Sequence, residues 1–205
     1  MYLPTQFDTP EHASTIMREH PFASMVSVDD EGFPFVTHLP LSLQEEGDTP
    51  HMLLGHCARA NPHVLYLQTR PQALVTFMGP QAYMSPRVYA DLQKVPTWSY
   101  LAVHVKVQAR MLDAEATKDA LLKQLIAEHE PAYADQWRGL PETYTHAMLK
   151  GIVAFELDIV SIQTKVKINQ HRPESHQSMY DLYQQGGEQE KALAQWMTRL
   201  GLIKP

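Results

Sequence analysis

The sequence predicts a mainly β protein, a β-barrel with helical additions, and three observations support this fold class. Six or seven short β-like runs follow one another, mostly through hairpin-type connections. Helices interrupt these runs without the regular alternation that a doubly wound parallel sheet needs, and no G-x-G-x-x-G stretch occurs. The 205 residues, 44% of them hydrophobic, are enough for one sizeable domain, or for one domain with an added terminal piece.

The N-terminal half is expected to begin with a short helix, because Thr9-Pro10 has the chemistry of a helix cap and a first helical residue. Asp29–Gly32 is a polar cluster with glycine, which is typical of a hairpin loop between two strands. The expected elements are, in order, a helix over 11–20, strands over 22–28 and 33–39, a polar loop over 44–51, a strand over 52–55, a helix over 62–68 and a strand over 73–78 that Gly79-Pro80 ends.

The C-terminal half returns to the sheet after a long loop. Residues 81–96 contain Pro86 and Pro96 and are expected to be irregular, as functional loops often are. The elements predicted after it are a strand from Trp98, helices over 114–129 and 141–150, strands over 153–159 and 161–168, and a helical segment over 174–202 split by Gly186-Gly187.

The stretch LLGHCARANP, residues 53–62, is a candidate anion site. An apolar run stops at His56, Arg59 follows, and Asn61-Pro62 has the chemistry of a helix start. Free N–H groups of a helix start, together with a guanidinium, would form a phosphate pocket. An ordinary capped helix with a surface arginine fits these ten residues equally well.

Composition narrows the function classes. The single Cys57 rules out an intramolecular disulfide framework, and the sequence contains no leader-like segment and no apolar run of membrane-spanning length, so we expect a cytoplasmic protein. A net charge of -6 disfavours a broad basic face for nucleic acid. The 11 histidines show no metal-binding spacing, so no metal site is predicted.

Further candidate groups lie at strand ends. Trp98 and Tyr100 would offer a stacking face for a planar ring, or they are core residues. His56 and His104 would donate to an anion or bind iron, although a lone strand histidine is more often structural. We see no Ser-His-Asp or Cys-His set, so the catalytic residues are unknown and a hydrolase is not supported.

Eight segments in order resemble the PaiB family of FMN-binding transcriptional regulators and span nearly the whole chain. They are MYLPTQF, PFASMVS, THLPL, LLGHCARANP, ALVTFMGPQAYMSPRVY, KVPTWSYLAVHV, GIVAFELDI and KVKINQHR. The resemblance implies a split β-barrel of the FMN-binding type and a homodimer that holds the flavin at the subunit interface. We expect a split-barrel FMN-binding-like domain over 1–170 and a C-terminal helical extension over 171–205 that packs on the barrel or on the dimer partner.

The resemblance also implies a set of cofactor-binding residues. The phosphate end would be at His56, Arg59 and Asn61. The strand His38, Leu39, Pro40 and Leu41 would face the isoalloxazine ring with its backbone. Trp98 and Ser99 would close the site, and Lys167 and Gln170 would reach in from the other subunit. Family members tend to have Lys-x-Ser-Gln-Asn where this chain has Asn169 and His171 in place of Ser and Asn, which puts the C-terminal contacts in doubt.

Three functions follow from these observations. The first is an FMN-binding protein with a role in negative transcriptional regulation or in redox chemistry, as a flavin-dependent oxidoreductase. The second is a haem-binding or haem-degrading split barrel, since related barrels use haem and the chain is rich in histidine. The third is a transcription factor that binds DNA directly, for which the basic stretch Lys165–Arg172 is the first place to look.

Overall fold

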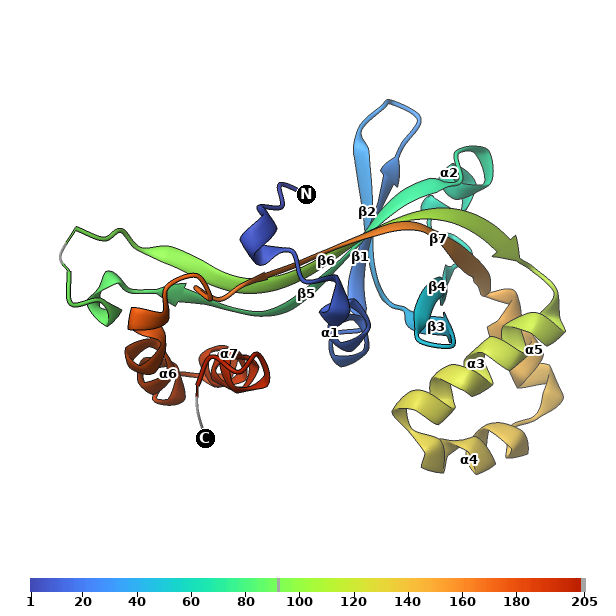
Figure 1. The fold of residues 1–205 in the computed structure, drawn as a ribbon. Coiled ribbons are helices and arrows are strands. Elements are labelled where there is room, and N and C mark those ends of the chain that lie inside the picture. The colour runs from blue at the N-terminus through green and yellow to red at the C-terminus, as the bar shows by residue number, and fades with distance from the viewer. Residues whose placement is uncertain (92, 204–205) are drawn as a thin grey trace. The chain divides into compact units, whose positions relative to one another are not determined.

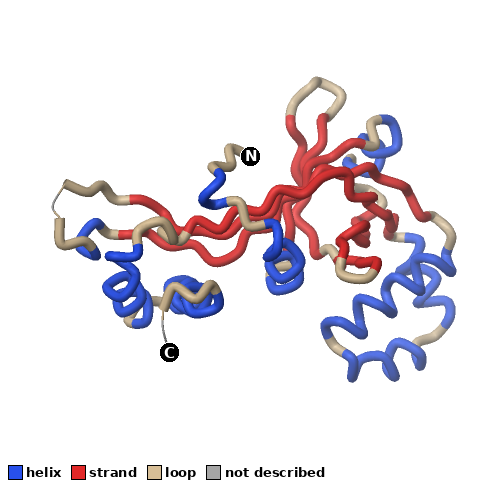
Figure 2. The backbone as a smooth tube through the Cα atoms, viewed as in Figure 1, coloured by secondary structure: helices blue, strands red, loops and turns tan. Residues whose placement is uncertain are grey.

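The computed structural model describes residues 1–91 and 93–203 (Figure 1). The predicted loop over 81–96 therefore contains one position outside the described residues, and so does the end of the predicted extension over 171–205. Seven strands form one sheet in the order β2-β1-β5-β6-β7-β4-β3. Figure 2 colours the strands red and the helices blue. The strands are β1 (Phe22–Val28), β2 (Pro34–Pro40), β3 (Ser42–Glu46), β4 (Thr49–Ala58), β5 (Gln72–Met84), β6 (Thr97–Leu112) and β7 (Ile152–Lys167).

The chain folds into two compact units, and the three longest strands contribute to both. The terminal unit comprises Met1–His20, Phe77–His104 and Ile162–Pro205. The central unit comprises Pro21–Thr76 and Val105–Ser161. The predicted division at residue 170 remains a prediction.

The central unit begins with the predicted hairpin. β1 and β2 pair antiparallel from Phe22↔Pro40 to Val28↔Pro34. The Asp29 carboxylate accepts backbone N–H bonds from Glu31 and Phe33 at 2.9 and 2.8 Å, which closes the loop. β4 pairs antiparallel with both β3 and β7. The helices of this unit are α2 (His63–Thr69), α3 (Glu115–His129), α4 (Ala134–Gly139) and α5 (Glu142–Lys150).

The terminal unit packs three helices with the remaining parts of β5, β6 and β7. These helices are α1 (Ala13–Glu19), α6 (His176–Gln184) and α7 (Glu188–Arg199). The α6–α7 break falls at Gly186-Gly187, as predicted, and the two helices contact each other. The apolar stripe on α7 is core, because Leu193 and Met197 are fully buried. An ion pair of 2.8 Å between Arg199 and Glu19 links α7 to α1.

Several sequence predictions about element boundaries were wrong. β5 does not end at Gly79-Pro80 but continues to Met84. Gly79 is buried, and a Cβ added to it would lie 2.9 Å from Leu101 Cβ, so this glycine permits a close approach of strands and does not mark a turn. The two strands predicted over 153–159 and 161–168 are one strand, β7, whose exposed Val160 interrupts the buried alternation.

Two elements were not predicted. β3 occupies part of the expected polar loop, and its pairing with β4 shifts register between Gln44 and Glu45. A register shift disturbs the alternation on which a strand prediction depends. Helix α4 follows the short turn Pro131–Tyr133 and has only six residues, too few to show a helical period.

Candidate functional site

Arg59 follows β4 and is held by three groups of the central unit. Its Nε donates to the Lys150 carbonyl at 2.8 Å, and its Nη2 donates to the Ile152 carbonyl at 3.2 Å. The same Nη2 forms an ion pair of 2.6 Å with Asp113. This contact, with a further one from Lys118, lowers the pKa of Asp113 below its ordinary value. The guanidinium is thus half-exposed and fixed in place, a suitable state for meeting an anion.

Asn61 organises the start of α2, as its cap chemistry predicts. Its Oδ1 accepts the backbone N–H of His63 at 3.0 Å, and its carbonyl accepts that of Val64 at 3.0 Å. Its Nδ2 donates to Thr37 Oγ1 at 3.1 Å. The helix itself is assigned from His63, one residue later than predicted.

His63 completes this network and was not predicted. Its Nδ1 lies 2.8 Å from Thr37 Oγ1, and its ring packs against Phe35 and Tyr66. The residue is 0% exposed, and burial lowers its pKa to about 4. His63 is therefore neutral at physiological pH and serves to fix β2 to the start of α2. A histidine directly after a proline gives no sequence signal of this role.

His56 lies on β4, opposite Ala154 of β7. Its half-buried ring has a lowered pKa because burial disfavours the charged form. Among the described residues, His56 Nδ1 is buried and finds no hydrogen-bond partner. A buried ring nitrogen without a partner is costly unless a ligand or a water supplies one.

The predicted ring-facing strand, 38–41, lies at the end of β2 and just beyond it. His38 is exposed, and its Nδ1 lies 2.9 Å from Ser24 Oγ. Leu39 and Leu41 are buried, whereas Pro40 is exposed. Leu41 packs over Gly55, since a Cβ built on that glycine would lie 2.5 Å from Leu41 Cδ2. The two leucines thus belong to the core of the central unit.

The terminal unit contains a pocket of about 300 Å³ between the loop before β6 and the end of β7. Of the predicted site residues, Trp98, Ser99 and Lys167 line this pocket. Trp98 is 54% exposed, and its ring lies edge-on to that of Tyr83. Lys167 Nζ donates to Thr97 Oγ1 at 2.5 Å, and burial lowers the pKa of its ammonium.

Ser99 and Gln170 are engaged within the chain. Ser99 is 1% exposed, and its Oγ accepts a hydrogen bond of 2.9 Å from the Tyr183 hydroxyl. Gln170 Nε2 donates to the Val166 carbonyl at 2.6 Å, and its Oε1 accepts the Ile168 N–H at 3.0 Å. Their predicted contacts with a cofactor remain predictions.

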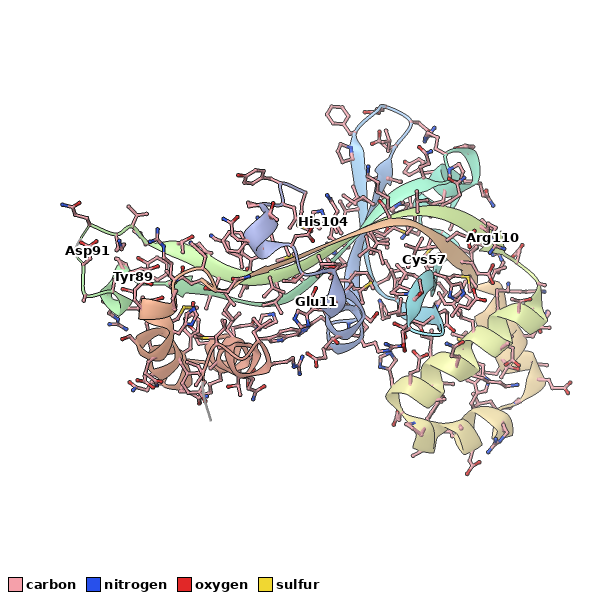
Figure 3. All side chains as sticks on the ribbon, viewed as in Figure 1. Glu11, Cys57, Tyr89, Asp91, His104 and Arg110 are labelled. Carbon is pink, nitrogen blue, oxygen red and sulfur yellow. The ribbon has the colours of Figure 1, made fainter. Side chains whose placement is uncertain are left out.

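Asn169, one of the two departures from the family pattern, has a structural role. It adopts φ 64°, a left-handed conformation that asparagine tolerates better than most residues. Its Nδ2 donates to the Tyr89 hydroxyl at 2.8 Å and to Ser175 Oγ at 2.7 Å. Tyr89 lies on the loop between β5 and β6 (Figure 3), so Asn169 ties that loop to the start of the C-terminal segment.

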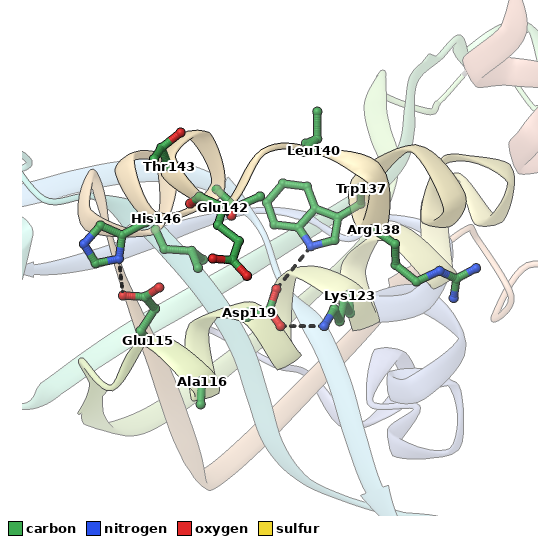
Figure 4. Close-up of a pocket in the computed structure, with 12 residues that line it drawn as sticks. Glu115, Ala116, Asp119, Lys123, Trp137, Arg138, Leu140, Glu142, Thr143 and His146 are labelled. Atoms are coloured by element: carbon green, nitrogen blue, oxygen red, sulfur yellow. Dashed lines mark hydrogen bonds and ion pairs between the residues drawn. The ribbon is translucent and has the colours of Figure 1, made fainter.

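A larger pocket, of about 790 Å³, lies among the helices α3, α4 and α5 of the central unit (Figure 4). None of the predicted site residues lines it. Its charged groups pair with one another, as His146 does with Glu115 at 2.6 Å and Lys123 with Asp119 at 2.6 Å. Trp137 Nε1 also donates to Asp119 at 3.1 Å. Arg138 and Glu142 also line the pocket, so charges of both signs surround it and do not indicate one class of ligand.

Cysteine and histidine are often reactive, and burial shifts the pKa of both Cys57 and His104. Burial raises the pKa of the Cys57 thiol to about 11, so the thiolate needed for nucleophilic attack is scarce at neutral pH (Figure 3). His104 is half-buried on β6, and its pKa is lowered by burial and by the N-terminal ammonium group. It belongs to the terminal unit, whereas His56 belongs to the central unit.

Comparison with known proteins decides the family. Residues 1–161 match the family model described as "Putative FMN-binding domain". The chain is 34% identical over 182 residues to protease synthase and sporulation protein PAI 2 of Bacillus subtilis (strain 168), an alignment that covers 85% of this chain and 84% of the relative. The chain belongs to the PaiB family of FMN-binding proteins. A second relative of this PaiB chain, the uncharacterized protein YKL070W of Saccharomyces cerevisiae, is 30% identical over 147 residues, 61% of this chain and 86% of the relative.

Solved structures confirm the fold of this PaiB protein. The flavocytochrome Anf3 from Azotobacter vinelandii superposes with a TM-score of 0.62 at 18% identity, covering 78% of this chain and 67% of that one. The FAD and heme binding protein from Mycobacterium smegmatis gives a TM-score of 0.59 at 16% identity, covering 78% and 72%. The predicted split β-barrel with helical additions is therefore confirmed. Among the described residues, no helix is long and apolar enough to cross a membrane.

The predicted site residues of the PaiB chain fall into two groups. His38–Leu41, His56, Arg59 and Asn61 belong to the central unit. Trp98, Ser99, Lys167 and Gln170 belong to the terminal unit. Sequence analysis missed the network around Asn61 and Arg59 in the central unit, which includes Thr37, His63 and Asp113. In the terminal unit it did not predict that Tyr89, Lys94 and Arg172 line the same pocket.

Proposed function

We propose that this PaiB protein binds FMN and that the flavin phosphate contacts the central unit at His56, Arg59 and Asn61. The observation that carries the proposal is the fixed guanidinium of Arg59, which the carbonyls of Lys150 and Ile152 hold at the end of β4. Arginine offers a phosphate a planar fork of donors, and the unpartnered Nδ1 of His56 supplies a further ring nitrogen nearby in sequence.

The isoalloxazine ring is proposed to lie along the backbone of residues 38–41, with Trp98 and Ser99 closing the site. The exposed face of Trp98 suits contact with a planar ring. Lys167 and Gln170 are proposed to reach the flavin from a second copy of the chain in a homodimer. These contacts rest on resemblance to the family.

The cellular role we propose is regulatory, in the cytoplasm. The Bacillus subtilis relative is named for protease synthesis and sporulation, processes that require control of gene expression. Direct DNA binding is a weaker candidate because the net charge of the chain is -6. Fluorescence anisotropy with a DNA duplex at two salt concentrations tests it, since specific phosphate contacts give salt-sensitive binding.

Haem is the second candidate ligand. Two structural neighbours are named as a flavocytochrome and as an FAD and heme binding protein. His56 and His104 are the strand histidines that would bind iron, and their lowered pKa values keep the neutral, ligating form. An absorption spectrum after addition of FMN or haem to the purified protein separates the two cofactors in one measurement.

The phosphate assignment is tested by titrating FMN into the Arg59→Ala variant. We expect affinity to fall roughly 10- to 100-fold, because hydrogen bonds to charged groups contribute about 1.5–3 kcal/mol. Arg70→Ala is the matched control. Arg70 is also a half-exposed arginine of the central unit that pairs with a carboxylate, Asp30, at 2.7 Å. Unchanged FMN affinity in folded Arg59→Ala protein would overturn the assignment.

A further inference from the structure

The pocket of the terminal unit has an unusual charge. Lys94, Lys167 and Arg172 line it, together with His171, whose pKa is lowered mainly by burial. Among its described lining residues, none is Asp or Glu. A concave site lined by cationic groups without a carboxylate attracts anions and repels cations. The charge of this pocket is the opposite of the net charge of the chain, which is -6.

Lys167 is the cation whose charge is least compensated. Its Nζ donates to the neutral hydroxyl of Thr97 and lies 5.9 Å from the ring centre of Tyr100. Within residues 1–91 and 93–203, no carboxylate forms an ion pair with it. The neighbouring Lys165 adds repulsion, which contributes to lowering the pKa of Lys167. A partly buried ammonium of this kind gains stability when an anion binds beside it.

The other two cations, Lys94 and Arg172, have carboxylate partners but still contribute positive charge to the pocket. Lys94 pairs with Asp91 at 2.9 Å, and Arg172 is 3.9 Å from Glu174, at the limit of an ion pair. Neither carboxylate lines the pocket. The Arg172 guanidinium is half-exposed and therefore available to an anion that enters.

Two aromatic side chains, Trp98 and Tyr89, are among the other residues that line the pocket. Trp98 is exposed over half its surface, and Tyr89 is fixed by the hydrogen bond from Asn169 to its hydroxyl. Rigid aromatic walls favour a planar, conjugated ligand. The volume of about 300 Å³ is at the lower end of the range for ligand pockets, which suits a small ring system better than a whole flavin nucleotide.

We propose that this pocket binds a small planar organic anion, an aromatic carboxylate or aryl phosphate, that is distinct from the flavin. Lys167 and Arg172 hold the anionic group, and Trp98 and Tyr89 contact the ring. The inference rests on the proposed function, because Trp98 and Lys167 are also proposed to contact the flavin. The second ligand would therefore lie beside the flavin and share these two side chains with it, while the flavin phosphate lies at Arg59. Such a ligand is a candidate reactant or effector of the flavoprotein.

The experiment is isothermal titration calorimetry with three probes of similar shape: benzoate, phenyl phosphate and neutral benzamide. Each is titrated into the full chain, with and without saturating FMN. We expect benzoate or phenyl phosphate to bind at least about tenfold more tightly than benzamide, because one charge-assisted hydrogen bond accounts for an affinity difference of that size. The tighter of the two anions identifies the ligand as a carboxylate or a phosphate.

Variants link the binding to the named side chains. Lys167→Met and Arg172→Gln are each expected to weaken binding of the anions about tenfold and to leave benzamide unchanged. Lys191→Met is the matched control, because Lys191 is an exposed lysine of the same unit, on α7, outside the pocket. Arg172 is exposed, so Arg172→Gln is expected to fold. It therefore tests the inference even if Lys167→Met does not fold.

The outcomes separate this inference from the proposed function. Equal binding of benzoate, phenyl phosphate and benzamide would overturn the inference, and so would anion binding that neither variant weakens. Competition between FMN and the anionic probes would also overturn it, because the pocket would then belong to the flavin. Anion binding by a protein that takes up no FMN would remove the proposed flavin function and leave the anion pocket standing.

Discussion

Arg59 Nη2 lies 2.6 Å from Asp113 Oδ1, and Lys118 Nζ lies 3.3 Å from the same oxygen. Two cations therefore share one carboxylate at the start of the segment that precedes α3. Lys118 is only 4% exposed, whereas Asp113 is largely exposed. A phosphate that reached Arg59 would meet this carboxylate as a competitor for the same guanidinium.

The Asp113→Asn variant is expected to bind FMN more tightly, by roughly two- to fivefold, because a like charge beside the phosphate is removed. FMN titration in low-salt buffer measures the change. Asp30→Asn is the matched control, since Asp30 pairs with Arg70 in the same way and lies outside the predicted site. Weaker FMN binding by Asp113→Asn would mean that this carboxylate positions Arg59 and does not compete for it.

His63 is expected to make stability depend on pH. Burial lowers its pKa to about 4 in the folded chain, from 6.5 in the unfolded chain. Between these values the unfolded state binds the extra proton, so the free energy of unfolding falls as pH decreases from 6.5 to about 4, by up to about 3 kcal/mol. Above pH 6.5 this contribution is fully present.

Urea unfolding of wild type and of His63→Gln across this pH range measures the effect. The variant is less stable at neutral pH, because it loses the Thr37 bond and the packing on Phe35, but its stability changes less with pH. His129→Gln, at an exposed position, is the control and keeps the wild-type pH dependence. The same pH dependence in His63→Gln as in wild type would show that other groups cause it.

Cys57 should be protected from alkylation in the folded chain. Its side chain is buried, and its pKa is raised to about 11, so little thiolate exists at pH 8. Iodoacetamide labelling followed by mass spectrometry is expected to be slow in buffer and rapid in denaturant. The chain has a single cysteine, so one mass shift reports the site. Fast labelling of the native protein would contradict the burial of this thiol.

Gly79→Ala is expected to destabilise the protein by about 1–3 kcal/mol, because the new Cβ would lie 2.9 Å from Leu101 Cβ. Urea unfolding measures the loss. Gly139→Ala is the control, since a Cβ at that position meets nothing within 4 Å and alanine favours the helical backbone of α4. Equal stabilities for the two variants would show that the β5 backbone moves away from β6 at little cost.

The fold was predictable where local chemistry and periodicity agree. The β1–β2 hairpin follows from its polar loop, and α6 and α7 separate at two glycines. The same reasoning failed at Gly79-Pro80, because glycine is required there by the closeness of Leu101, a contact between residues far apart in sequence. The long strand β7 was predicted as two pieces because two exposed residues, Val160 and Ser161, lie between its buried parts.

The candidate site was predictable only in part, for a related reason. The role of Asn61 follows from cap chemistry, which acts over a few residues. The partners of Arg59 lie more than 50 positions away, at Asp113, Lys150 and Ile152, and no local pattern indicates them. The charge of the terminal-unit pocket likewise depends on Lys94 and Lys167, which only the folded chain brings to one cavity.

Because of the way the terminal unit is built, the chain cannot simply be cut into its two units. That unit is assembled from three separate stretches of sequence, and β7 crosses from one unit into the other between Ser161 and Ile162. A fragment cut after residue 161, where the match to the family model ends, would lose the last part of β7 together with Lys167 and Asn169. Truncated fragments are therefore unsuited to assigning ligands to either unit, and point variants in the full chain are the appropriate tool.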